Sequence, residues 1–233
     1  CGVPCAPYAV IETTEQLAAV PDHLLPGILK TARMGYDGKG QARVTTRAEL
    51  AQAWADMQQL PCVLEKMLPL QLECSVIVAR GANGDCVNLP LQRNLHREGI
   101  LAVTEVYAGN VPQALAERAI AAAKAIAAEL NYVGVLCVEF FVLDESNPAA
   151  QGLGGLVVNE MAPRPHNSGH YSMDACDVSH AGWTVLGAAA SAQPVHHAQP
   201  DGRHLARRRR AAVGAGAGAV GHAFASVWQA ACR

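Results

Sequence analysis

Asn159-Glu160-Met161-Ala162-Pro163-Arg164-Pro165-His166-Asn167-Ser168-Gly169-His170 follows the apolar run Leu156-Val157-Val158. An acid at the end of a buried strand, and then a loop stiffened by two prolines, put charge and hydrogen-bond donors where a core would exclude them. Such a loop indicates a functional site. Its composition also fits an ordinary surface turn rich in Pro, Asn and Gly, so residues elsewhere must decide between the two.

The composition is that of a soluble globular protein with a sizeable core. Of 233 residues, 51% are hydrophobic and only 16% are charged. The formal net charge of −2 is uneven, because residues 1–180 sum to −7 and the remainder to +5. The longest late apolar run, 211–227, consists mainly of Ala and Gly and is shorter than the roughly 20 residues that a membrane span needs. We therefore expect no membrane segment.

The eight cysteines contain no C-x-x-C pair, and five lie in or beside apolar strand-like runs, where Cys acts as a small hydrophobe. This favours a reducing, cytoplasmic compartment over a disulfide framework. The start, Cys1-Gly2-Val3-Pro4-Cys5, has neither a signal peptide nor an initiator Met, so we expect the interior of a longer chain. The cysteines are Cys1, Cys5, Cys62, Cys74, Cys86, Cys137, Cys176 and Cys232.

The first part of the chain has a strand that ends in a lysine and then a glycine-rich loop. Thr13 is expected to cap a short helix, and residues 26–31 form a strand that carries Lys30. Three glycines follow within residues 35–41, and two lysines, Lys30 and Lys39, add positive charge. Such a loop can turn its backbone N–H groups onto an anion, and it can equally be a hairpin turn.

The next segments alternate between helix and strand. Thr46 is expected to cap a helix that reaches Gln59, and strands are expected over 62–67 and, after Glu73, over 74–79. Residues 87–103 should be extended, with a polar bend at 93–99 in which His96 is either solvated or functional. A long helix should run from Pro112 to Leu130 with one apolar face. This order predicts an α+β fold.

Two acids interrupt strongly apolar strands. Glu139 lies between Val138 and Phe140, and Glu160 follows the next apolar run. A buried unpaired carboxylate is unfavourable, and a shared divalent cation would explain both acids, because Mg²⁺ takes one or two carboxylates together with phosphate oxygens. The alternative is two acids on the solvated edge of a sheet.

These motifs together resemble the ATP-grasp superfamily and, within it, the N5-carboxyaminoimidazole ribonucleotide synthase family of purine biosynthesis. The segment 159–170 is typical of this carboxylase family rather than of the whole superfamily. The resemblance covers residues 1 to about 179 and rests on segments 28–31, 35–41, 65–66, 73–76, 94–101 and 159–170.

The resemblance implies an ATP-grasp fold, in which two α+β lobes sandwich the nucleotide. Residues 1–25 would lead into the domain, 26–80 would form the small lobe and 81–179 the large lobe. Residues 180–233 would be a low-complexity tail that departs from the family. The family's N-terminal domain would precede Cys1.

The resemblance also implies a nucleotide site. Lys30 and the glycine-rich loop would cover the triphosphate, 65–68 would be a hinge holding adenine, Glu73 would bind the ribose, and His96 would add a contact. The implied ATP-binding residues are Lys30, Gly35, Tyr36, Asp37, Gly38, Lys39, Gly40, Gln41, Glu65, Lys66, Met67, Leu68, Glu73, His96, Asn159 and Glu160.

The implied chemistry is that of a ligase that forms a C–N bond in IMP biosynthesis. Glu139 and Glu160 would hold Mg²⁺, or Mn²⁺ in its place. Bicarbonate would attack ATP to give carboxyphosphate, and the amine of 5-aminoimidazole ribonucleotide would capture the carboxyl group. The implied catalytic residues are Arg164, His166, Asn167 and Ser168, and the implied substrate contacts are Tyr36, Asp37, Lys39, Arg164 and His166.

The tail is compositionally foreign to the rest. Residues 181–233 contain no Lys, Glu, Ile, Asn, Met or Tyr, and 207–210 are four arginines followed by Ala and Gly without periodicity. We expect a shifted reading frame of a GC-rich gene and poor order, rather than a nucleic-acid patch, because no aromatic residues are interleaved. The family otherwise implies a cytoplasmic homodimer. Two alternatives stay open: another ATP-grasp carboxylate–amine ligase, and an inactive nucleotide-binding fragment.

Overall fold

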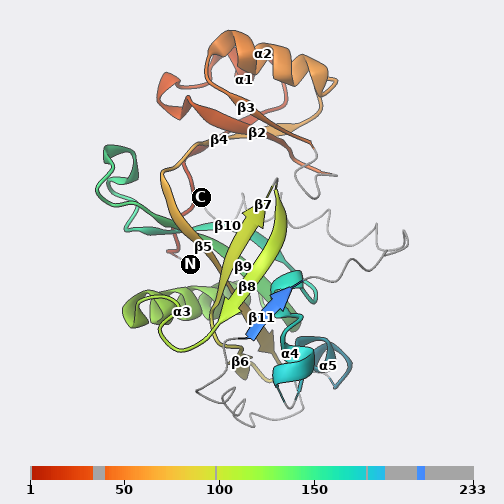
Figure 1. Cartoon of the computed structure of the whole chain (residues 1–233). Coiled ribbons are helices and arrows are strands. Elements are labelled where there is room, and N and C mark those ends of the chain that lie inside the picture. The colour runs from red at the N-terminus through yellow and green to blue at the C-terminus, as the bar shows by residue number, and fades with distance from the viewer. Residues whose placement is uncertain (1, 34–39, 98, 177, 187–203, 208–233) are drawn as a thin grey trace. The chain divides into compact units, whose positions relative to one another are not determined.

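The computed structural model describes residues 2–33, 40–97, 99–176, 178–186 and 204–207 (Figure 1). The chain forms two compact units, of which the first contains Cys5–Pro69 and the second takes up the chain at Leu70. Both units combine antiparallel strand pairs with helices. The α+β class expected from the sequence is therefore confirmed.

The first unit is a four-stranded sheet in the order β1-β4-β2-β3, with helices packed on it. Thr13 caps the first helix through a reciprocal pair of bonds with Gln16, and Thr46 caps the second, both as expected. The second helix ends before the expected Gln59, because Gln58 and Gln59 adopt positive φ. Its elements are β1 (Tyr8–Ile11), α1 (Thr14–Ala18), a 3-10 turn (Asp22–Leu24), β2 (Gly27–Thr31), β3 (Gln41–Val44), α2 (Arg47–Asp56) and β4 (Cys62–Lys66).

The second unit is built around a sheet in the order β10-β9-β5-β7-β8-β11, with β6 paired to β5. Strands β5 and β9 pair along almost their whole length, from Leu70 opposite Leu143 to Arg80 opposite Gly134. Its strands and helices are β5 (Leu70–Arg80), β6 (Cys86–Asn88), β7 (Gln92–Arg97), β8 (Ile100–Val106), α3 (Gln113–Glu129), β9 (Gly134–Leu143), β10 (Leu156–Ala162), α4 (Ser172–Ala175), α5 (His180–Leu186) and β11 (His204–Arg207). Two 3-10 turns, Pro148–Ala150 and Asn167–Gly169, flank β10.

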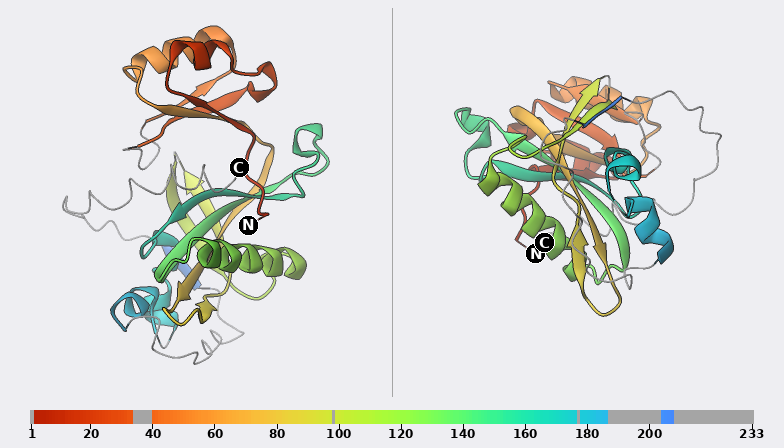
Figure 2. Two further views of the ribbon diagram at one scale, coloured as in Figure 1. Left: turned by 180° about the vertical axis from the view of Figure 1, so that it is seen from behind. Right: turned by 60° about the horizontal axis from the view of Figure 1, so that its bottom comes forward.

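Helices cover both faces of β5 and β9 (Figure 2). The long helix α3 packs on one face through Ala119, Ala123 and Ile126, which are buried as its sequence period predicts. The other face meets α5, where Ile77 and Trp183 belong to one buried cluster. Because side chains alternate along a strand, the residues at odd-numbered positions of β5 face α5 and the loop that precedes it.

One expectation about a polar segment was wrong. Residues 93–97 are not a bend but lie within β7, where buried and exposed positions alternate: Asn94 is buried, whereas Arg93 and Leu95 are exposed. Glu160 lies near the end of β10, as expected from the apolar run before it, and the strand continues to Ala162. His96 and Glu160 therefore both lie on sheet backbone rather than on a loop.

The tail is described only in α5 and in β11, which pairs with β8. Residues 187–203 and 208–233, including most of the arginine run, lie outside the described residues, as does most of the glycine-rich loop, 34–39. None of the helices in the described ranges has the length and apolar character needed to cross a membrane.

Candidate functional site

One face of the second unit's sheet carries polar side chains from neighbouring strands. Glu73 and Ser75 lie two positions apart on β5 and so share a face. Ser75 is the cross-strand partner of Glu139 on β9, and Glu139 is in turn the partner of Glu160 on β10. Three carboxylates that are distant in sequence are therefore brought onto one face.

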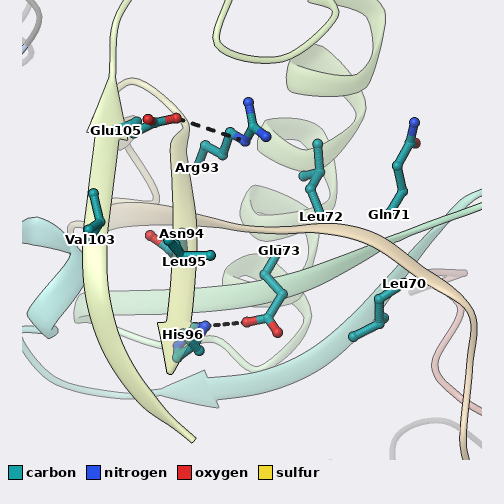
Figure 3. Close-up of a pocket in the computed structure, with 10 residues that line it drawn as sticks. All are labelled: Leu70, Gln71, Leu72, Glu73, Arg93, Asn94, Leu95, His96, Val103 and Glu105. Atoms are coloured by element: carbon teal, nitrogen blue, oxygen red, sulfur yellow. Dashed lines mark ion pairs between the residues drawn. The ribbon is translucent and has the colours of Figure 1, made fainter. Parts of the chain in front are cut away.

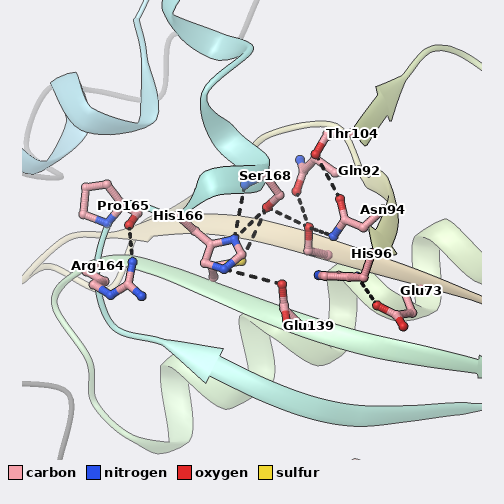
Figure 4. Close-up of polar contacts among 12 residues, drawn as sticks. Glu73, Gln92, Asn94, His96, Thr104, Glu139, Arg164, Pro165, His166 and Ser168 are labelled. Atoms are coloured by element: carbon pink, nitrogen blue, oxygen red, sulfur yellow. Dashed lines mark hydrogen bonds and ion pairs between the residues drawn. The ribbon is translucent and has the colours of Figure 1, made fainter. Parts of the chain in front are cut away.

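The Glu139 carboxylate is the most enclosed of these groups. Its side chain is 14% exposed, and burial, with a further contribution from Glu160, raises its pKa to about 7. His166 Nε2 lies 3.4 Å from Glu139 Oε1 (Figure 4). Burial, followed by the charge of Arg164, lowers the pKa of His166 to about 4, so this imidazole is neutral at pH 7.

A second acid–histidine pair lies farther along the same face. Glu73 on β5 forms an ion pair with His96 on β7, and the hydrogen bond from His96 to Glu73 raises the pKa of the imidazole. A pocket opens beside this pair, as Figure 3 shows, where Arg93 also points toward Glu105. The pocket is lined by Leu70, Gln71, Leu72, Glu73, Arg93, Asn94, Leu95, His96, Val103 and Glu105.

The loop after β10 presents its side chains in different ways. Arg164 is exposed, and its guanidinium donates to the Pro165 carbonyl at 3.0 Å. Asn167 is half-buried at the start of a 3-10 turn, whereas Ser168 is fully buried. Asn159, next to Glu160 in the strand, is also half-buried.

In the first unit, Lys30 on β2 pairs with Glu65 on β4, with 2.5 Å between Nζ and Oε2. The backbone N–H groups of Lys66 and Met67 donate to the carbonyls of Pro7 and Pro26. Leu68 is buried, and Met67 is 39% exposed. Of the candidate residues of the glycine-rich loop, Gly40 and Gln41 are described, whereas Gly35, Tyr36, Asp37, Gly38 and Lys39 lie outside the described residues.

The backbone conformation and the close approach of Thr31 explain why residue 40 is a glycine. Its φ is +74°, and a Cβ at this position would lie 2.6 Å from Thr31 Oγ1. The Gly40 carbonyl accepts from the Thr31 backbone N–H, which extends the antiparallel pairing of β2 and β3 past Lys30 and Gln41.

Sequence reasoning missed a buried polar network behind the acids. Ser75, Gln92, Asn94 and Thr104 lie on three strands and bond to one another or to Ser168. Their signal was the period-2 spacing, since Ser75 follows Glu73 by two positions and Asn94 precedes His96 by two.

The carboxylates form a pair rather than a complete metal cage. Among the residues that the structure describes, no group of three or more His, Cys, Asp or Glu side chains could hold a metal ion. Two carboxylates side by side do suit a hard divalent cation whose other ligands come from phosphate oxygens or water.

The family model of the ATP-grasp domain matches residues 1–180. N5-carboxyaminoimidazole ribonucleotide synthase from Bacillus subtilis is 41% identical over 179 residues, which are 76% of this chain and 45% of that protein. The chain thus spans about half the length of the curated relatives that it matches.

Solved structures of N5-carboxyaminoimidazole ribonucleotide synthases are also similar to this chain. The Staphylococcus aureus synthetase complexed with ADP superposes with a TM-score of 0.70 at 34% identity, covering 83% of this chain and 49% of that one. The Aspergillus clavatus synthase in complex with ADP and 5-aminoimidazole ribonucleotide has a TM-score of 0.66 at 26% identity, covering 79% and 46%.

Proposed function

Because this chain belongs to the ATP-grasp domain family, we propose that it is the nucleotide-binding part of an N5-carboxyaminoimidazole ribonucleotide synthase. The full enzyme would use ATP and bicarbonate to carboxylate 5-aminoimidazole ribonucleotide in purine biosynthesis. The observation that carries the proposal is the convergence of Glu73, His96, Glu139, Glu160 and His166 on one face of the sheet. A row of carboxylates and imidazoles would be unfavourable in a hydrophobic core, but it is suited to binding a metal-bound nucleotide and an oxyanion.

The nucleotide contacts would come from several segments of the chain. Lys30 would supply a cation to the phosphates, and loop 35–41 would add backbone donors to oxygens whose charge redistributes during phosphoryl transfer. Residues 65–68, where the chain leaves the first unit, would bind adenine. Glu73 would accept from the ribose hydroxyls, and His96 would support it through their ion pair.

Glu139 and Glu160, helped by Asn159, would hold Mg²⁺ or Mn²⁺ against the β- and γ-phosphates. The fit rests on their being cross-strand partners with hard oxygen donors. The cation would supply charge neutralisation of the triphosphate during transfer.

The carboxylation half-site would be formed by the loop after β10. Arg164 is exposed and cationic, and would bind the bicarbonate oxygens together with His166 and Asn167; Tyr36, Asp37 and Lys39 would close over them. A bicarbonate oxygen would bond to the γ-phosphorus as the bond to ADP breaks. The substrate amine would then bond to the carboxyl carbon, losing a proton as phosphate leaves. Water exclusion would protect carboxyphosphate, so loop closure belongs to the mechanism.

We further propose that the full-length enzyme is a cytoplasmic homodimer that binds no nucleic acid, and that residues 180–233 are a non-family tail from a shifted reading frame. These statements rest on the family resemblance and on composition. Light scattering of the full-length enzyme tests the dimer, and the DNA sequence around these codons tests the tail.

The test of function is turnover by the 233-residue chain. ADP release that requires both bicarbonate and 5-aminoimidazole ribonucleotide supports the proposal. ADP release with a different carboxylate and amine would instead identify another ATP-grasp ligase. If calorimetry detects binding of Mg·ADP without any turnover, the chain is an inactive nucleotide-binding fragment, and an absence of nucleotide binding overturns the proposal.

A further inference from the structure

Behind His166 lies a chain of buried hydrogen bonds that the proposed reaction does not use (Figure 4). Ser75 and Ser168 are both fully buried, and their hydroxyl oxygens are 2.9 Å apart. Asn94 Nδ2 donates to Ser75 Oγ at 2.9 Å, and Thr104 Oγ1 donates to Asn94 Oδ1 at 3.3 Å. The chain of bonds therefore ties strands β5, β7 and β8 to the turn that carries His166.

The same turn determines which nitrogen of His166 carries the proton. The Ser168 backbone N–H donates to His166 Nδ1 at 3.3 Å, and the Ser168 hydroxyl lies 3.0 Å from the same nitrogen. A backbone N–H can only donate, so Nδ1 must be an acceptor without a proton. The imidazole proton is then on Nε2, which is the nitrogen that faces Glu139.

We propose that Ser75 and Asn94 are positioning residues, which hold the 166–168 turn against the sheet and keep His166 as the tautomer with a protonated Nε2. In this state Nε2 carries the proton, so it can donate a hydrogen bond but cannot accept a proton. The consequence for catalysis rests on the proposed function: His166 orients an anionic oxygen as a donor and is not a general base at Nε2. Ser75 itself touches no substrate, because it is fully buried.

The tautomer can be read directly by long-range ¹H–¹⁵N correlation on the ¹⁵N-labelled 233-residue chain, with His166→Gln to assign the signals. We expect the shift of an unprotonated nitrogen for Nδ1 and of a protonated nitrogen for Nε2 at pH 7. A proton on Nδ1 overturns the proposal. No nucleotide or substrate is present, so this result is independent of whether the proposed function holds.

The positioning role is tested by removing the link to the sheet. Ser75→Ala should move the ¹⁵N chemical shifts of both His166 ring nitrogens toward the average of the two tautomers. Ser75→Thr keeps the hydroxyl and should restore the wild-type chemical shifts. Ser172→Ala is the matched control, because Ser172 is equally buried but bonds to Gly169 and His180. Asn94→Leu removes the donor to Ser75 without touching the contacts of the imidazole, and serves if Ser75→Ala does not fold. Wild-type shifts in whichever of these two variants folds would overturn the positioning role.

Discussion

Glu139 and Glu160 are direct partners across β9 and β10, so two acids from separate apolar strands lie side by side. Glu160 is exposed, and its substitution by Gln removes charge without removing core volume. We expect Glu160→Gln to weaken Mg·ADP binding at least about tenfold, since bonds to charged groups contribute about 1.5–3 kcal/mol. In the full-length enzyme the same change should abolish Mg²⁺-dependent ATP turnover.

Calorimetric titration measures this affinity, and Glu129→Gln provides the control, because Glu129 is an exposed acid at the end of α3. Both variants should unfold within about 0.5 kcal/mol of the wild type, as surface substitutions usually do. Unchanged affinity in Glu160→Gln would remove this residue from the metal site.

The Lys30–Glu65 pair is expected to matter both for nucleotide binding and for stability. Both side chains are largely buried, at 23% and 25% exposed, so loss of the lysine leaves the Glu65 carboxylate unpaired and should lower the free energy of unfolding by about 1–3 kcal/mol. Lys30→Met should weaken ATP binding roughly tenfold, because a phosphate loses a charged donor. Denaturant titration and calorimetry give the two quantities, with Lys124→Met on α3 as control. A large loss of stability with unchanged affinity would show that the lysine is purely structural.

Phe140 stabilises the sheet face opposite to Glu139. It is fully buried, and truncation to Ala should cost about 3–5 kcal/mol, from lost burial and the cavity that remains. Leu95→Ala, at a site that is 52% exposed, should change stability by less than about 0.5 kcal/mol. Equal losses of unfolding free energy in the two variants would contradict the assigned packing of β9.

Cys74 should be chemically inert in the folded chain. Burial, followed by the charges of Glu139 and Glu73, raises the pKa of its thiol to about 12. Because the thiolate is the reactive form and is scarce below that pKa, iodoacetamide should label Cys74 at about pH 8 only after unfolding. Cys86 is less buried and should react first, which peptide mass spectrometry can follow over time. Rapid labelling of Cys74 in the folded protein would contradict this prediction and show that β5 transiently separates from its neighbouring strands.

Local patterns were sufficient for most elements of the fold. The apolar face of residues 112–130 predicted α3, the threonine caps predicted the starts of α1 and α2, and the apolar run around Glu139 predicted β9. They failed at β7, where Asn94, His96 and Arg97 resemble a polar bend. Strand propensity depends on what covers each face, and a single sequence does not contain that information.

For the candidate site, too, the sequence predicted some features and only the structure showed the others. An acid inside an apolar strand is anomalous wherever the strand lies, because an isolated buried carboxylate is unfavourable; Glu139 and Glu160 could therefore be singled out from their neighbours in sequence. Their pairing, the contact of Glu73 with His96 and the bonds from Ser75 to Ser168 depend on strand order and register. Register is set by packing across the whole sheet, since a slip of one residue would turn every side chain to the other face, and so only the tertiary structure could decide them.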